Sequence, residues 1–314
     1  MASVATQWQR LVDVIDRLQR RFRVSAISVG VIKRYGDDRG GMYAALITFY
    51  GLLSVFPLLL LFSTVASRLL GPDSKATKSL INSALEQFPV IGTRLSANVH
   101  ALSRGNTLAT VVSALFLLWG ALGVTSALQT ASHRMWRRPR FEEPDVLKRT
   151  ARGLLLLGVV AASVVLTTAA AALSSSGYLR QFSTILPLAI FIAQVVVNIG
   201  SYFLALKILA PPGTSWRALV PGTIVGGLGW SILQQVGGYL ISHQLHRTSE
   251  IYGFFAIVLG LIFWLNLGAQ LFLLSSELNV VLATSAWPRG LTEPSDEVKA
   301  ELAKAHEEAE PPSN

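Results

Sequence analysis

Polar side chains recur at helical spacing inside otherwise apolar stretches, and these are the residues of the chain that could do chemistry. Asn266, Gln270 and Glu277 are offset so that they fall within about 40° of one another on a helix. Two further stretches carry the same kind of stripe. Polar side chains in lipid normally face the bundle interior or a wet cavity. We expect these residues to line a shared central pocket, or alternatively to bond neighbouring helices together; the candidates are Gln194, Asn198, Ser231, Gln235, Tyr239, Asn266, Gln270 and Glu277.

Glu277 is the acidic residue closest to the interior of any apolar stretch. A carboxylate within a membrane is by default a functional hypothesis, as a proton relay or as the partner of an ion. It also lies near one end of its stretch, where Arg134, Arg137 or Lys207 could pair with it. Both interpretations stay open on the sequence.

The residues that metal-dependent or nucleophilic catalysis would need are scattered. His243 and His246 are three apart, but no carboxylate-rich motif accompanies them, and the chain has no cysteine. Nuclease or hydrolase metal sites require clustered His and Asp ligands. No phosphate-binding Gly-rich loop and no serine elbow is present either. We therefore expect no enzymatic activity, no bound metal and no cofactor.

Six long stretches without a charged residue dictate the elements that must position these side chains. The chain is 51% hydrophobic and only 14% charged, with a mean hydropathy of +0.48. A helix needs roughly 20 apolar residues to cross a bilayer, and each stretch is that long. We predict an all-α fold, a polytopic membrane helical bundle of six transmembrane helices, with spans at about 42–70, 108–131, 153–173, 185–209, 219–242 and 252–282.

The net charge of +9 is distributed in a way that indicates a membrane topology. With the six predicted spans, 20 of the 27 lysine and arginine residues fall on the side of the N-terminus. Cytoplasmic loops carry such an excess of positive charge. We expect a multi-pass protein of the bacterial inner membrane with both termini in the cytoplasm. Membrane lipids are the expected partners and nucleic acid is not, and a homo-oligomer is left open.

The chain outside the spans divides into short segments. Residues 1–41 are predicted to form basic amphipathic cytoplasmic helices, which lie on the anionic inner leaflet or, alternatively, pack under the bundle or against a second copy. Residues 42–285 form the membrane domain, and its outer connection 73–106 should hold two amphipathic helices. Residues 286–314 are expected to be a mobile cytoplasmic tail. Pro57 should kink the first span, and the basic residues expected at the membrane surface are Arg10, Arg17, Arg20 and Arg21.

Four segments carry a specific pattern of residues. The strongest runs from Tyr43 to Leu60 and contains AA, FY, LS and FPLLL; the others are Leu128 to Trp136, Pro221-Gly222, and Tyr252 to Asn279. Across roughly residues 25–285 these segments resemble the YihY/BrkB family of bacterial inner-membrane proteins. Some of its members are called virulence factor BrkB and were once labelled ribonuclease BN. His133, Asn266 and Ser275-Ser276 depart from the family's pattern.

The resemblance implies a six-span inner-membrane protein with cytoplasmic termini, and proposals for the family lean toward lipid handling or transport in the cell envelope. Combined with the polar stripes, it leads us to expect transport or flipping of an envelope-related lipid or small solute through a central polar cavity. The alternative is a scaffold that transports nothing and holds cell-envelope machinery. Ribonuclease activity finds no support in the residues.

Overall fold

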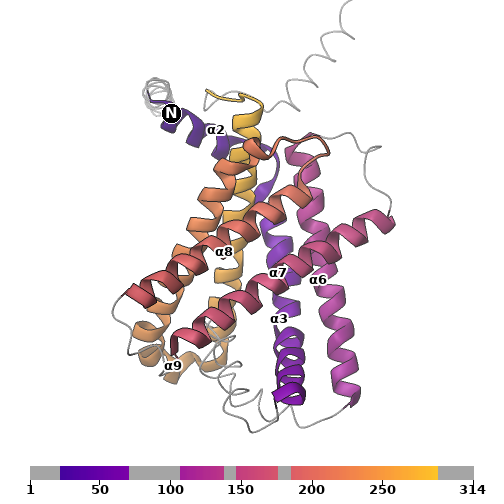
Figure 1. Ribbon diagram of the computed structural model, residues 1–314, viewed down its shortest axis with the longest axis vertical. Helices are drawn as coiled ribbons and strands as arrows, with labels where there is room; N and C mark the ends of the chain where they lie inside the picture. The colour runs from indigo at the N-terminus through magenta and orange to yellow at the C-terminus, as the bar shows by residue number, and fades with distance from the viewer. Residues whose placement is uncertain (1–21, 71–106, 138–145, 176–184, 289–314) are drawn as a thin grey trace, which may run out of the picture.

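In the computed structural model, the structure describes residues 22–70, 107–137, 146–175 and 185–288, and their side chains except those of 56–70, 107–110, 113, 168–175, 185–187 and 238–257. All regular structure in these ranges is α-helical, as predicted. The helices are α2 (Arg23–Asp37), α3 (Gly40–Leu70), α6 (Thr107–Met135), α7 (Val146–Ser175), α8 (Ile185–Leu209) and α9 (Trp216–Ala283) (Figure 1).

The helix bounds follow the predicted spans closely, and the differences lie at the charged ends. α8 has the predicted limits, whereas α7 begins at Val146, seven residues before the predicted span. The added turns contain Arg149, whose guanidinium donates to Ser126 and Thr130 of α6 at 2.7 and 2.8 Å. An arginine with such partners can be part of a helix that reaches into the membrane. The uncharged stretch is therefore shorter than α7 itself.

α9 combines the fifth and sixth predicted spans in one continuous helical element. A straight helix of 68 residues would be about 100 Å long, yet its start lies against its end. The Gly222 N–H donates to the Asn279 side-chain oxygen at 2.7 Å, and the Trp230 and Trp264 rings are 5.2 Å apart. α9 therefore reverses direction between these contacts and forms two antiparallel limbs (Figure 1).

Four helical segments in the described ranges are long and apolar enough to cross a membrane. They are Ala114–Met135, Val146–Thr167, Leu188–Leu209 and Val258–Ala283, and α3 adds the shorter apolar segment Gly40–Val55. Many of their large apolar side chains are exposed, as for Trp119, Val165 and Phe263. Exposed apolar surface of this kind is what lipid covers. The chain is thus a multi-pass membrane protein.

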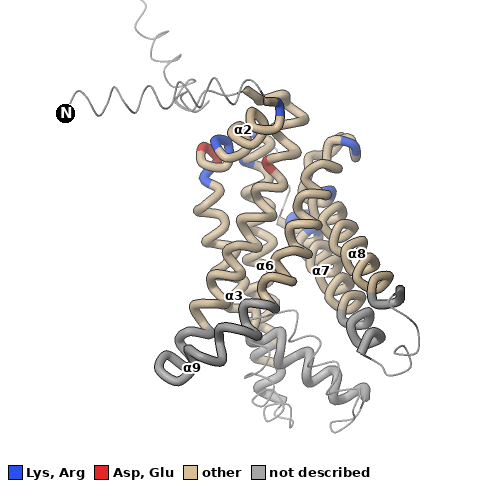
Figure 2. The backbone as a smooth tube through the Cα atoms, turned by 90° about the vertical axis from the view of Figure 1, so that its left-hand side faces the viewer, with Lys and Arg blue, Asp and Glu red and all other residues tan. Residues whose placement is uncertain are grey.

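The charged residues that the structure describes gather toward one end of the bundle (Figure 2). α2 lies across this end and packs on the close of α9, where Gly30 approaches Val281. Arg23 covers the Trp287 ring at 5.1 Å. The ends of α6 and α8 and the starts of α7 and α9 meet there too. The charged residues at these helix ends are Lys33 and Arg34 on α2, Arg134 on α6, Lys148, Arg149 and Arg152 on α7, Lys207 on α8, and Arg217 and Glu277 near the start and the end of α9.

The membrane helices form two groups. α3, α6 and the second limb of α9 stand side by side and share a core, while α7 and α8 form a slanted pair that crosses them (Figure 1). α8 also packs closely on the first limb of α9, where Gly226 lies against the Tyr202 ring and Gly227 against the Ile199 backbone. Small residues allow this close approach of the two backbones.

Several predictions fall on residues beyond the described ones. They include Arg10, Arg17, Arg20 and Arg21, the outer connection, the C-terminal tail, and the side chain of Pro57. α3 is helical on both sides of Pro57. Ser54, a natural substitute partner for the Leu53 carbonyl that Pro57 leaves without its helical hydrogen bond, donates instead to the Tyr50 carbonyl at 2.8 Å.

Candidate functional site

Two of the polar residues predicted on the fourth and fifth spans, Asn198 and Ser231, bond directly to each other. The Asn198 amide of α8 donates to the Ser231 hydroxyl at 3.0 Å and to the Gln234 side-chain oxygen at 3.1 Å, both on the first limb of α9. Asn198 and Ser231 are buried. Since Asn198 uses both amide hydrogens on these two partners, this contact is a hydrogen-bonded helix junction.

A second polar chain joins α9 to α3. Gln270 donates to the Asn266 side-chain oxygen at 2.6 Å, and the Asn266 amide donates to Thr48 of α3 at 3.3 Å. Thr48 in turn donates to the Ala44 carbonyl at 2.7 Å. The sequence predicted Asn266 and Gln270 on one helix face, which agrees with this contact, but gave no sign of Thr48 as the partner.

The remaining candidates for the cavity do not join these contacts. Gln194 on α8 is half-buried and Gln235 on α9 is exposed, while the Tyr239 side chain lies outside the described residues. The bonds made by Asn198 and Asn266 favour the second of the two alternatives, in which polar side chains link helices. The cavity stays a prediction.

Glu277 has an ion-pair partner that the sequence did not suggest. Its Oε2 accepts from Arg34 Nε of α2 at 3.3 Å, whereas the expected partners were Arg134, Arg137 and Lys207. Glu277 is fully buried and Arg34 is 3% exposed. Arg34 Nη2 also donates to the Met135 carbonyl at the end of α6, at 2.6 Å. One guanidinium thus ties α2 to α6 and α9.

A second carboxyl lies at the same guanidinium. Asp38 Oδ2, at the end of α2, is 3.8 Å from Arg34 Nε, and Asp38 is 6% exposed. Burial raises the pKa of Asp38 above its ordinary value, while the positive charge of Arg34, a hydrogen bond with Glu277 and the charges of Arg137 and Arg134 oppose the rise. We call Arg34, Asp38 and Glu277 the buried ionic cluster.

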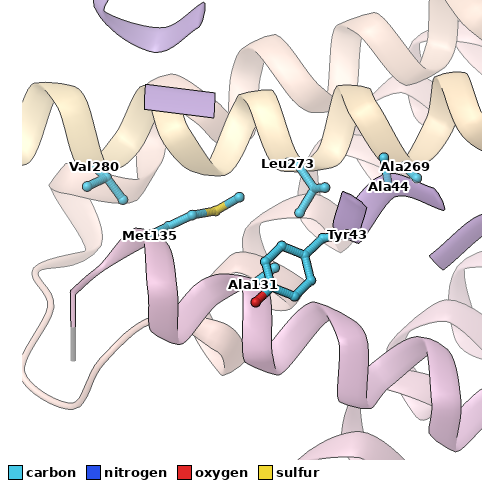
Figure 3. Close-up of a cluster of buried hydrophobic side chains, with 7 residues drawn as sticks. All are labelled: Tyr43, Ala44, Ala131, Met135, Ala269, Leu273 and Val280. Carbon is cyan, nitrogen blue, oxygen red and sulfur yellow. The ribbon is translucent and has the colours of Figure 1, made fainter. Parts of the chain in front are cut away.

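Four segments singled out in the sequence meet beside this cluster. Tyr43 and Ala44 of α3, Ala131 and Met135 of α6, and Leu273 of α9 pack in one hydrophobic core (Figure 3). Gly222 lies against Asn279, where a Cβ would overlap the Ser275 carbonyl oxygen, so only glycine fits at this crossing. The patterned segments therefore build the junction of α2, α3, α6 and both limbs of α9.

α6 and α7 meet in a separate polar junction at the charged end. Arg149 of α7 bonds to Ser126 and Thr130, and its carbonyl accepts from Gln129 at 3.1 Å. Close by, a Cβ at Gly153 would lie 2.7 Å from Thr125 Oγ1. These contacts fix where the pair of α7 and α8 crosses the group formed by α3, α6 and the second limb of α9.

One sequence signal could have revealed the buried ionic cluster. Ala26, Gly30, Arg34 and Asp38 follow each other at four-residue spacing, so they share one face of α2. Two small residues on a face indicate close packing, and a charged pair that continues such a face has to find a buried partner. As for metals, no group of three or more His, Cys, Asp or Glu side chains comes together in the part of the chain that the structure describes.

Comparison with known proteins identifies the family. The sequence profile of the family described as Virulence factor BrkB matches residues 31–300, which is most of the chain. The chain belongs to this family, as its residues had suggested. No curated protein and no solved structure matches it significantly.

Proposed function

We propose that this BrkB-family protein is a six-span protein of the bacterial inner membrane, with both termini in the cytoplasm, that moves an envelope-related amphiphile between the leaflets. The gathering of the described charges at one end (Figure 2) supports this topology, because basic residues favour the cytoplasmic side. The two antiparallel limbs of α9 support an even number of spans.

α2 fits the cytoplasmic surface of the membrane. It lies across the charged end of the bundle (Figure 2), and it exposes Val24 and Ile32 beside Arg23. A helix with apolar and basic exposed residues settles at the boundary of headgroups and acyl chains. The anionic lipids of the inner leaflet are therefore its expected partners.

The observation that carries the proposal is the way in which α6 and α7 meet. Their junction at Ser126, Thr130, Arg149 and Gly153 is polar and lies at the charged end. Further along, exposed apolar side chains follow both helices; they are Val111, Val112, Leu115, Phe116, Leu118 and Trp119 on α6 and Leu155, Val160, Val165 and Leu166 on α7. A polar junction followed by exposed apolar side chains on both helices matches the two parts of a lipid, its headgroup and its acyl chains.

A scaffold without transport activity is the second candidate, and the packing of α8 on α9 favours it. The Asn198 amide donates both of its hydrogens, to Ser231 and to Gln234, and Gly226 lies against the Tyr202 ring. Helices that interlock in this way leave little room for a solute between them. In our proposal the amphiphile accordingly moves along the α6–α7 surface and not between α8 and α9. We expect neither candidate to involve enzymatic chemistry.

Leaflet exchange in reconstituted vesicles tests the proposal. The purified protein is placed in liposomes of anionic and zwitterionic phospholipid with a fluorescent phospholipid, and the fraction quenched by an impermeant reductant is followed over time. We expect faster exchange than in empty liposomes. Gly153→Val, which pushes against Thr125, should slow the exchange, and the matched control Gly158→Val, with no neighbour within 4 Å, should not. Exchange equal to that of empty liposomes would favour the scaffold.

A further inference from the structure

The buried ionic cluster contains more negative than positive charge. Arg34 carries one positive charge at any pH of interest, since a guanidinium does not lose its proton in proteins. Asp38 and Glu277 would contribute two negative charges, and all three residues are at most 6% exposed. A buried net charge is expensive and a group in this position tends to become neutral instead. One proton on the carboxyl pair makes the cluster neutral.

The hydrogen bonding around the two carboxyls shows where such a proton fits. Glu277 Oε1 and Asp38 Oδ2 are buried oxygens without a hydrogen-bond donor among the described residues. The two carboxyls lie within hydrogen-bonding reach of each other. Two carboxylates can only accept, whereas a carboxylic acid donates its O–H to a carboxylate in a short, strong bond.

Among the described residues, the neighbouring acid is Asp37, which precedes Asp38 at the end of α2. From α2 the carboxyl pair faces Arg34, with Tyr35 next along the helix, and from the end of α6 it faces Arg134 and Arg137, near His133. Between Gly40 and Val55, where the structure describes the side chains of α3, the helix contains no charged residue. The α6 arginines reduce the tendency to hold a proton, but for Asp38 burial outweighs them.

We propose that Asp38 and Glu277 form a proton-binding site, in which the two carboxyls share one proton beside Arg34 at neutral pH, and that release of this proton loosens α2 from the bundle. In the bound state the proton sits on one carboxyl oxygen and is donated to the other carboxylate. On release it passes to water, both carboxyls become charged, and their two negative charges exceed the single positive charge of Arg34. This inference does not depend on the proposed lipid transport.

Infrared difference spectroscopy tests whether the proton is present. At neutral pH the wild-type protein should show the C=O band of a protonated carboxylic acid, and the band should disappear as the pH is raised. Asp38→Asn and Glu277→Gln should each abolish it, while Asp37→Asn, at the neighbouring acid, should keep it. A wild-type protein without the band would overturn the proposal, and a melting temperature that rises with added Na⁺ would then identify a cation site instead.

Cysteine reactivity tests whether α2 loosens, because the chain has no cysteine of its own. Both residues belong to α2: Ala26 is on its buried face and Ser28 is exposed. The labelling rate of the Ala26→Cys variant, divided by that of the Ser28→Cys variant, corrects for thiol ionisation. This ratio should rise with pH, and it should stay constant when Asp38→Asn is added. A ratio independent of pH in the otherwise wild-type protein would contradict the proposed release of α2.

Discussion

At the scale of single residues, the Arg34 side chain joins α2 to α6 and α9 and neutralises charge in the buried ionic cluster. It bonds to Glu277 and to the Met135 carbonyl, and its Nε lies within 4 Å of both buried carboxyls, at 3.3 Å from Glu277 and 3.8 Å from Asp38. A buried ion pair contributes little net stability, but removal of one partner leaves a buried charge without compensation. The large cost of removing one partner of the pair gives a direct prediction.

Arg34→Ala should destabilise the protein by about 3–5 kcal/mol, because Glu277 and Asp38 lose their counter-charge. The measurement is the melting temperature in detergent, and Lys148→Ala, at an exposed basic residue of α7, is the control that should leave it nearly unchanged. The double variant with Glu277→Gln should recover part of the loss. Equal stability of the Arg34→Ala variant and the wild type would show that the cluster is open to water.

Asp38 gives a prediction for the dependence of stability on pH. Its pKa is raised in the folded state by burial, against the opposing charge of Arg34. Its contribution to stability is therefore fully present below its unfolded pKa, near pH 4, and is lost as the pH rises through the folded pKa. Melting temperatures of the wild type should fall relative to Asp38→Asn as the pH rises from 4 toward 8. A wild-type melting temperature that rises relative to that of Asp38→Asn over this pH range would contradict the prediction.

At the scale of helices, the two limbs of α9 cross in close contact at Gly222. The backbone at Gly222 lies against the Ser275 carbonyl and the Asn279 side chain, and this contact holds the second limb in the position from which Glu277 reaches Arg34. A side chain at position 222 has to push the limbs apart. The cost of such overpacking is typically about 1–3 kcal/mol.

Gly222→Ala should consequently lower the free energy of unfolding by about 1–3 kcal/mol or more, whereas Gly200→Ala on α8, with open space around it, should be neutral or stabilising by up to about 1 kcal/mol. Unfolding in a denaturing detergent, followed by circular dichroism, compares the two variants. Similar behaviour of both variants would mean that the limbs can separate at no cost.

The helices themselves could be predicted from the sequence, but the contacts between them only in part. The apolar pattern of the sequence located α8 to the residue, with Lys207 in its last turn, and α3 and α6 nearly so. It could not locate the start of α7, because the partners of Arg149 lie on another helix. For the same reason the helical face shared by Asn266 and Gln270 was predictable and their partner Thr48 was not. Pairing between distant segments depends on packing, which spacing along one helix does not encode.

At the scale of the whole molecule, the described charges form one polar end on an otherwise apolar bundle (Figure 2). α2, the buried ionic cluster and the α6–α7 junction all belong to this end. In the proposed function this end lies at the cytoplasmic surface, where anionic lipids reach it.

Cysteine labelling in intact cells tests this orientation most directly. A single cysteine is introduced in place of Ser28 on α2 or of Ser176 after α7, and an impermeant maleimide is added before and after the inner membrane is opened. We predict that Ser176→Cys reacts in intact cells, and that Ser28→Cys reacts only once the membrane is opened. Reaction of Ser28→Cys from the periplasm, with Ser176→Cys protected, would contradict the account.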